Sequence, residues 1–229
     1  MDQEKNFYKI EENVKLIVFD MAGTTVDEGG LVYKTLVSTI RSYGIRIDDD
    51  EIKNWYGVNK TQVLKYFLNR SGQDDTKLES MLNDFKTSLK KNYFEDDNVG
   101  LMDSRLPCLL NKFRNRGVKV GLNSGFSVDI QEALIERLNL RDCIDFYVSS
   151  ESVPHGRPEP YMIQNLMKQS GIQDPSEVVK VGDSINDILE GKNSGCHKSI
   201  GVLSGAETRE NLLKAGADIV LDSVMDLGI

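Results

Sequence analysis

Cysteine and histidine are scarce in this sequence. Its 229 residues include three cysteines, which lie far apart and form no Cys-x-x-Cys pair. A disulfide framework is therefore not expected, because such frameworks use an even number of suitably spaced cysteines. The two histidines, His155 and His197, offer little to a zinc site or a serine–histidine triad. We interpret His197 as structural, and His155 fits a surface loop better than the mouth of a site.

Positive charge and long hydrophobic runs are also lacking. The formal net charge is -8 and the isoelectric point about 4.9, which argues against a basic face for nucleic acid or a membrane surface. A local cluster of cations still permits a small anionic substrate. No apolar run approaches the ~18 residues that span a bilayer, and the polar N-terminus has no signal-peptide core. We expect a cytoplasmic protein, either a monomer or a homodimer.

Short apolar segments alternate with amphipathic ones over most of the chain. Strand, loop and helix at this spacing predict an α/β fold, a doubly wound, Rossmann-like parallel sheet with helices on both faces. The expected strands are 15–19, 117–122, 146–148, 178–181, 199–203 and 219–221. The helices expected between the later strands are 106–115, 129–138, 161–170, 187–194 and 207–215.

One segment near the N-terminus departs from this alternation. Between residues 31 and 94 the pattern predicts helices at 31–43, 61–68 and 78–94, with a further one opening at the acidic run 48–51, and no strand. We interpret the segment as a small all-helical cap domain, residues 29–99, inserted into a core domain made of residues 1–28 and 100–229.

Polar side chains gather where the expected parallel strands stop. The first strand ends at Asp20, the second at Asn123 and Ser124, and a later one at Asp183. In a doubly wound sheet these ends line one crevice. Two aspartates there would repel each other unless a cation lay between them, and a hard divalent ion such as Mg²⁺ suits oxygen ligands. Asp187 is placed to orient Asp183 or a ligating water.

Four motifs in this order resemble the haloacid dehalogenase superfamily. The resemblance covers residues 15 to about 205 and fits the branch with a small helical cap after the first motif. The motifs are Asp20-x-Ala22-Gly23-Thr24, Ser124-Gly125, Arg157-Pro158-Glu159-Pro160 and Val181-Gly182-Asp183-Ser184-x-x-Asp187.

The resemblance implies a role for each matching residue in phosphoryl chemistry. Asp20 would be the nucleophile that attacks phosphorus and forms an aspartyl-phosphate. Thr24, Ser124 and Gly125 would bind the phosphoryl group. Arg157, where most members have lysine, would neutralise phosphate charge and steady Asp20. An anionic nucleophile attacking an anionic group needs cations to screen both.

The same resemblance implies a metal site. Asp183 would bind Mg²⁺ together with Asp20 and the backbone carbonyl of Ala22, and Asp187 would support the site. The side chain of Ala22 is the unusual feature, because most phosphatases of the superfamily carry there a second aspartate that protonates the leaving group. A methyl group cannot do this.

One branch that lacks this acid is the phosphonoacetaldehyde hydrolases, which the chain resembles from Asp20 to Asp27 and at Gly156-Arg157-Pro158. In these enzymes a cap lysine forms a protonated imine with the aldehyde of the substrate, and the imine accepts the electrons of the C–P bond as it breaks. Lys60, three residues after Gly57, is similar in position to that lysine. Lys60 has two other interpretations, a solvated cap charge or a phosphate-binding cation. Val63 stands where the resemblance leads us to expect a histidine.

Four functions therefore stay open on the sequence. The first is a Mg²⁺-dependent phosphonatase-like hydrolase acting on a small phosphonate aldehyde. The second is a phosphomonoesterase of the phosphoglycolate or sugar-phosphate type. A haloacid dehalogenase is disfavoured because such enzymes need no metal, whereas Asp183 is present. The fourth is a phosphate-binding protein without activity, and this hypothesis does not account for the presence of Asp20, Arg157 and Asp183 together.

Overall fold

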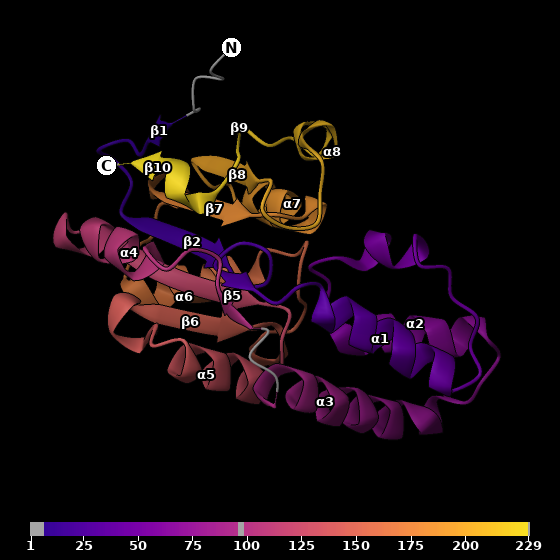
Figure 1. Cartoon of the computed structure of the whole chain (residues 1–229). Coiled ribbons are helices and arrows are strands. Elements are labelled where there is room, and N and C mark those ends of the chain that lie inside the picture. Colours follow the sequence, from indigo (N-terminus) through magenta and orange to yellow (C-terminus); the bar gives the residue numbers. More distant parts are fainter. Residues whose placement is uncertain (1–6, 96–98, 229) are drawn as a thin grey trace, which may run out of the picture.

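A six-stranded parallel sheet forms the centre of the protein in the computed structural model, which describes residues 7–95 and 99–228. The strand order is β6-β5-β2-β7-β8-β9. The expected α/β fold is confirmed (Figure 1). The strands are β2 (Leu16–Asp20), β5 (Lys119–Ser124), β6 (Phe146–Ser149), β7 (Val178–Gly182), β8 (Lys198–Val202) and β9 (Ile219–Leu221).

Helices cover both faces of this sheet because successive side chains of each strand point to opposite sides. Ile17 and Phe19 share an apolar cluster with residues of α4 and α5. Leu16 and Val18 pack instead with residues of α6. The covering helices are α4 (Leu106–Asn115), α5 (Val128–Arg137), α6 (Tyr161–Ser170), α7 (Ile185–Asn193) and α8 (Arg209–Lys214).

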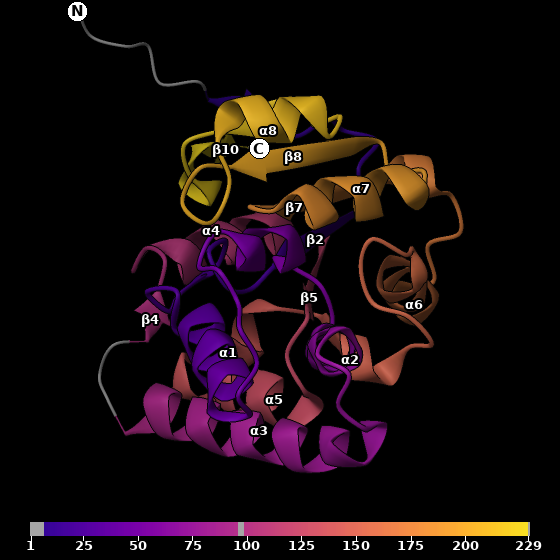
Figure 2. The same cartoon turned by 90° about the vertical axis from the view of Figure 1, so that its right-hand side faces the viewer.

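Three helices form a separate layer beyond the carboxyl ends of the strands, and we call residues 31–94 the cap. Figures 1 and 2 show α3 running beneath α1 and α2 and reaching back to the core. The expectation of helices without a strand holds for this segment. Its elements are α1 (Leu31–Ser42), α2 (Lys60–Arg70) and α3 (Leu78–Phe94), with 3₁₀ turns Glu51–Trp55 and Asp75–Lys77.

The acidic run 48–51 does not open an α-helix, which corrects one expectation. Only the 3₁₀ turn Glu51–Trp55 follows it. Gly57, two residues after that turn, has φ +75. A left-handed residue cannot continue a right-handed helix, so the chain turns there and restarts at Asn59, whose side chain accepts from the backbone N–H of Thr61.

Two short strand pairs were not expected. β1 (Tyr8–Lys9) pairs with β10 (Leu227–Gly228) and joins the two ends of the described chain. β3 (Val26–Asp27) pairs antiparallel with β4 (Gly100–Leu101), at the places where the chain leaves the core for the cap and returns. Both crossings are thereby held together at the base of the cap. Residues 96–98, near the expected domain boundary, lie outside the described residues.

Candidate active site

The site lies where the topology of the sheet reverses. β2 is flanked by β5 on one side and β7 on the other, and the chain continues outward in opposite directions from these strands. Such a reversal opens a crevice at the carboxyl ends of the strands. Asp20 ends β2, Ser124 ends β5, and Asp183 follows β7. Three segments remote in sequence thus bring their polar residues together.

The turn after β2 is shaped so that backbone and side chains can surround Asp183. The backbone N–H of Val26 donates to the carbonyl of Met21 at 2.8 Å, which closes the turn. Gly23 has φ +80, and a Cβ there would lie 2.5 Å from Asp183 Oδ2. Only glycine suits both conditions. Thr24 is fully buried, and its hydroxyl donates to Asp183 Oδ1 at 3.1 Å. In this structure Thr24 therefore orients Asp183.

Arg157 is the buried cation that organises the floor of the site. Its Nη2 lies 2.6 Å from Asp20 Oδ1, and its side chain is 1% exposed. Its Nε lies 3.0 Å from Glu190 Oε2 and 3.1 Å from Asp187 Oδ1. The guanidinium also donates to the backbone carbonyl of Asn123 at 3.1 Å. Because these partners come from three other segments, the position of Asp20 is fixed by packing from several sides.

A second buried cation, Lys180, lies beneath Arg157. Its Nζ is 2.8 Å from Asp187 Oδ1 and 3.7 Å from Glu190 Oε2. It also donates to Asn123 Oδ1 at 2.9 Å. We call the whole set the charged floor: Asp20, Asn123, Arg157, Lys180, Asp183, Asp187 and Glu190.

The charged floor has an excess of negative charge when all its groups are ionised. Four carboxylates face two cations, a net charge of −2. Burial and the nearby Asp20 carboxylate raise the pKa of Asp183 well above its usual range. Burial also raises the pKa of Asp20, although Arg157 opposes this. Two adjacent acids that resist ionisation are the electrostatic signature of a place for a cation.

The oxygen donors fit a divalent metal ion. One carboxylate oxygen each from Asp20, Asp183 and Asp187 lie within 4.8 Å of one another. Hard cations prefer such oxygen ligands, and one divalent ion would cancel the excess charge. Ser184 donates to Asp187 through both its amide and its hydroxyl, and Lys180 occupies the other oxygen. Asp187 Oδ1 pairs with two cations, Arg157 and Lys180, whereas Asp20 pairs with Arg157. Asp183 accepts from neutral donors, the hydroxyl of Thr24 and the amide of Ala206. Asp183 and Asp20 therefore keep more negative charge for a metal ion than Asp187 does.

A cavity of about 360 Å³ opens above the charged floor and below the cap. Asp20, Arg157 and Asp183 line it from the core, together with Ser124 and Gly125. Ala22 also lines it. Three residues of the cap form the far wall of the cavity: Tyr33, Tyr56 and Lys60.

Lys60 is buried in this cavity and is not a solvated surface charge. It is 7% exposed, and its Nζ donates to the carbonyl of Val58 at 2.8 Å. The ammonium also lies 4.7 Å from the centre of the Tyr33 ring. Burial, and then the charge of Arg157, lower the pKa of Lys60 from 10.5 to about 8. A substantial fraction of the amine is therefore neutral near physiological pH, as a nucleophile must be.

Glycines allow the cap to approach the core closely enough to enclose the cavity. A Cβ on Gly57 would lie 2.7 Å from Ser184 Oγ. A Cβ on Gly125 would lie 3.3 Å from the carbonyl of Val58. Asn59 donates to Ser150 Oγ at 3.0 Å across the same contact. The turn before Lys60 is thereby pressed against the core.

Comparison with known proteins decides the family. The model of the haloacid dehalogenase-like hydrolases matches residues 17–202. The chain belongs to this family. The phosphonoacetaldehyde hydrolase of Bacteroides fragilis is 26% identical over 258 aligned positions, which cover 94% of this chain and 95% of that protein. This haloacid dehalogenase-like hydrolase is therefore an enzyme, and the family resemblance inferred from four motifs is confirmed.

Solved structures agree with the fold of the hydrolase. A phosphonoacetaldehyde hydrolase-like protein from Oleispira antarctica has a TM-score of 0.80 at 22% identity, over 93% of this chain and 90% of that chain. A β-phosphoglucomutase from Clostridium difficile has a TM-score of 0.78 at 19% identity, over 92% and 91%. These likenesses establish a shared fold.

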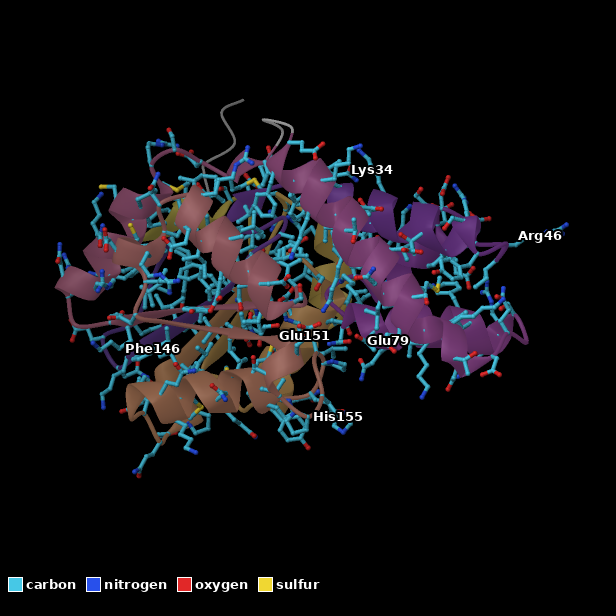
Figure 3. The ribbon with its side chains drawn as sticks, turned by 90° about the horizontal axis from the view of Figure 1, so that it is seen from below. Lys34, Arg46, Glu79, Phe146, Glu151 and His155 are labelled. Atoms are coloured by element: carbon cyan, nitrogen blue, oxygen red, sulfur yellow. The ribbon has the colours of Figure 1, made fainter. Side chains whose placement is uncertain are left out.

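Other sequence interpretations can be placed in the same structure. His155 is exposed, and in Figure 3 it lies at the outer edge of the molecule, as expected for a surface loop. The same view shows Glu151 close to the cap helix α3, where it pairs with Lys86 at 2.9 Å. Within residues 7–95 and 99–228, no helix is long and apolar enough to cross a membrane.

Sequence reasoning missed four residues of the hydrolase site. A buried ion pair at Lys180 could have been predicted, because a lysine inside the buried strand Val178–Gly182 must have a charged partner. The place of Glu190 in the site could be predicted only once the direction of α7 was known. Tyr33 and Glu28 gave no signal, because their place in the cavity depends on how α1 leans on the core.

Proposed function

We propose that this protein is a Mg²⁺-dependent hydrolase that uses Asp20 to attack the phosphorus of a small phosphonate carrying an aldehyde. The observation that carries the proposal is the buried amine of Lys60 in the cavity that also contains Asp20. Its pKa of about 8 suits an amine that forms an imine. We also propose that residues 29–99, which include the cap helices, form a cap domain over a site built from a core domain of residues 1–28 and 100–229.

The phosphoryl end of the substrate would lie against the core. Arg157 holds the Asp20 carboxylate at 2.6 Å and would neutralise phosphoryl charge. Ser124 and Gly125 would donate to phosphoryl oxygens. Asp183, Asp20 and the backbone carbonyl of Ala22 would hold Mg²⁺, which screens the repulsion between the carboxylate and the anionic substrate when bound. Attack by Asp20 would leave an aspartyl-phosphate, which water then hydrolyses.

The aldehyde end would lie against the cap. The neutral amine of Lys60 would add to the carbonyl carbon, and the adduct would take up one proton and lose water to give a protonated imine. When Asp20 forms its bond to phosphorus, the C–P bond breaks and its electron pair moves into the imine as an enamine. No oxygen leaves in this step, so the methyl group of Ala22 is compatible with it. The curated relative at 26% identity bears the name phosphonoacetaldehyde hydrolase, which supports this choice.

A phosphomonoesterase is the second candidate, and Val63 favours it. The resemblance to phosphonoacetaldehyde hydrolases implies a histidine near the lysine, but Val63 is fully buried in the apolar cluster of the cap. Lys60 would then bind phosphate as a cation. This candidate needs another source for the proton that Ala22 cannot supply.

Borohydride trapping separates the two candidates. The enzyme, incubated with phosphonoacetaldehyde and sodium borohydride, should gain the mass of the reduced adduct on Lys60, and Lys60→Arg, which keeps the charge, should gain none. Release of phosphate from small esters without any adduct would favour the phosphomonoesterase. Asp20→Asn should abolish phosphate release with either substrate class, and wild-type rates in this variant would contradict the nucleophile assignment.

A further inference from the structure

A buried carboxyl group that the proposed reaction has not yet used faces the same cavity. Glu28 lies between β3 and α1, is 5% exposed and lines the cavity together with Lys60. The hydroxyl of Tyr93 in α3 donates to Glu28 Oε2 at 2.9 Å. The backbone N–H of Val32 donates to the same oxygen at 2.7 Å. Residues of α1 and α3 therefore fix this carboxyl in place.

Burial makes this carboxyl group take up a proton more readily than a carboxyl group in water, and the two donors define which oxygen then carries the proton. Burial raises the pKa of Glu28, and the amide of Val32, the Tyr93 hydroxyl and the charge of Lys60 only partly oppose this. Because both donors bond to Oε2, a neutral Glu28 carries its proton on Oε1. Besides Lys60, the titratable groups that face it include Tyr33, Tyr56 and Tyr93, whose pKa values burial raises. These phenols stay protonated and leave Glu28 as the acid of this wall.

Imine formation needs such an acid. When Lys60 adds to an aldehyde, the product is a carbinolamine, whose hydroxyl leaves as water only after it receives a proton. Val63 offers no imidazole for this task, and His155 is exposed on the outer surface. We propose that Glu28 is the catalytic acid that protonates this hydroxyl, a role that rests on the proposed imine chemistry of Lys60.

The proton balance of this step closes within the site. The C–O bond of the carbinolamine breaks, the oxygen departs as water with the proton of Glu28, and the nitrogen lone pair forms the C=N bond. The products are a protonated imine on Lys60 and a Glu28 carboxylate, whose opposite charges attract each other in a buried site. After the C–P bond has broken, the enamine carbon needs a proton. Solvent supplies this proton, and water then hydrolyses the imine on Lys60 and the aspartyl-phosphate on Asp20. The protein returns to its starting state once solvent has also reprotonated Glu28.

Rapid-quench trapping on the complete chain tests the proposal. The wild type and Glu28→Gln are mixed with phosphonoacetaldehyde, quenched with borohydride at increasing times, and the Lys60 adduct is measured by mass spectrometry. Glutamine keeps an oxygen for Tyr93 and Val32 but cannot give up a proton in this way. We expect adduct formation about 10²-fold slower at full final yield, because general acids contribute at least that factor. Glu79→Gln, which changes an exposed carboxyl in the first turn of the cap helix α3, is the matched control and should leave the rate unchanged.

A second variant changes the acid without removing it. Tyr93→Phe deletes a hydroxyl that stabilises the carboxylate of Glu28, so it should raise the pKa of Glu28. The fall of the trapping rate on the basic side should then begin at a higher pH than in the wild type. If the role of Tyr93 were purely structural, the substitution would lower the trapping rate but leave the pH at which the rate begins to fall unchanged.

Each outcome is distinct. Slow trapping in Glu28→Gln, together with a fall of the trapping rate that begins at a higher pH in Tyr93→Phe, would support the role of Glu28 as the catalytic acid. Wild-type trapping rates in Glu28→Gln would overturn the role of Glu28 and leave the imine chemistry of Lys60 standing. If the wild type gave no adduct at all, the imine chemistry and this role would both be wrong.

Discussion

Replacing Lys180 by methionine would remove one of the two cations of the charged floor while keeping most of its volume. The lysine side chain is fully buried and lies 2.8 Å from Asp187 Oδ1 and 3.7 Å from Glu190 Oε2. In Lys180→Met these carboxylates lose a partner and cannot turn to water, and Arg157 remains as their nearest cation. The charge excess of the floor grows from −2 to −3 if every other group stays ionised.

The loss of stability in Lys180→Met can be worked out from the buried ion pair between Lys180 and Asp187. Removal of one partner from a buried ion pair destabilises a protein by about 3–5 kcal/mol. The hydrogen bond from Lys180 to Asn123 Oδ1 adds about 1 kcal/mol. The free energy of unfolding should therefore fall by about 5 kcal/mol, a large share of the roughly 5–15 kcal/mol typical of a whole protein. Adding Glu190→Gln removes a negative charge in turn, so the double variant should recover about half of this loss.

Urea unfolding followed by circular dichroism, in EDTA at pH 7, measures these free energies if the urea dependence is equal in all variants. The deficit of Lys180→Met should shrink as the pH falls. Burial opposes ionisation of Asp187, but Arg157 and Lys180 together hold its pKa below the ordinary value, so its contribution is present above pH ~4 and lost below. A loss under about 1 kcal/mol at pH 7, or strictly additive effects in the double variant, would refute the idea of a coupled charged floor.

Three further predictions concern the metal, the lysine and the cap contact. Mg²⁺ at about 100 times its Kd should raise the melting temperature by roughly 5–10 °C in calorimetry, and Asp183→Asn should remove this shift. Lys60→Met should abolish imine trapping yet raise the free energy of unfolding at pH 7 by up to about 3 kcal/mol, because the pKa of Lys60 is lowered from 10.5 to about 8. This gain should be complete below pH 8 and vanish above pH 10.5; an unchanged stability would show that Lys60 is solvated. Gly57→Ala should lower kcat/KM at least tenfold, because φ is +75 and the new Cβ would lie 2.7 Å from Ser184 Oγ; wild-type kinetics would show that the cap contact is not needed.

Elements with a regular apolar pattern could be predicted from the sequence with accurate bounds. The cap helix Leu78–Phe94 places Met81, Phe85 and Leu89 four residues apart on one buried face. The buried strands were readable because their apolar runs end in polar residues. Since parallel strands end at one edge, the same pattern predicted that Asp20 and Asp183 would meet, as they do.

The remaining features depend on contacts between distant segments. A two-residue strand such as Tyr8–Lys9 has no periodicity, and its partner lies at the other end of the chain. The burial of Lys60 depends on the contact of its turn with Gly125, which no local pattern reveals. Glu28 looks like an ordinary acidic residue at the start of a helix until Tyr93, 65 residues away, is packed against it.

The apolar cluster that contains Phe19 of β2 also contains Leu64 and Phe85 of the cap, without a break between them. Tyr93 strengthens the joint by packing edge-on against Phe126, with 5.8 Å between ring centroids. Segments that share a core lose their packing together, so the chain should melt in one cooperative transition. An insertion that looks modular in the sequence is thus energetically part of the whole. Substitutions that adapt the cap to a new substrate would be selected under a constraint on the stability of the entire protein.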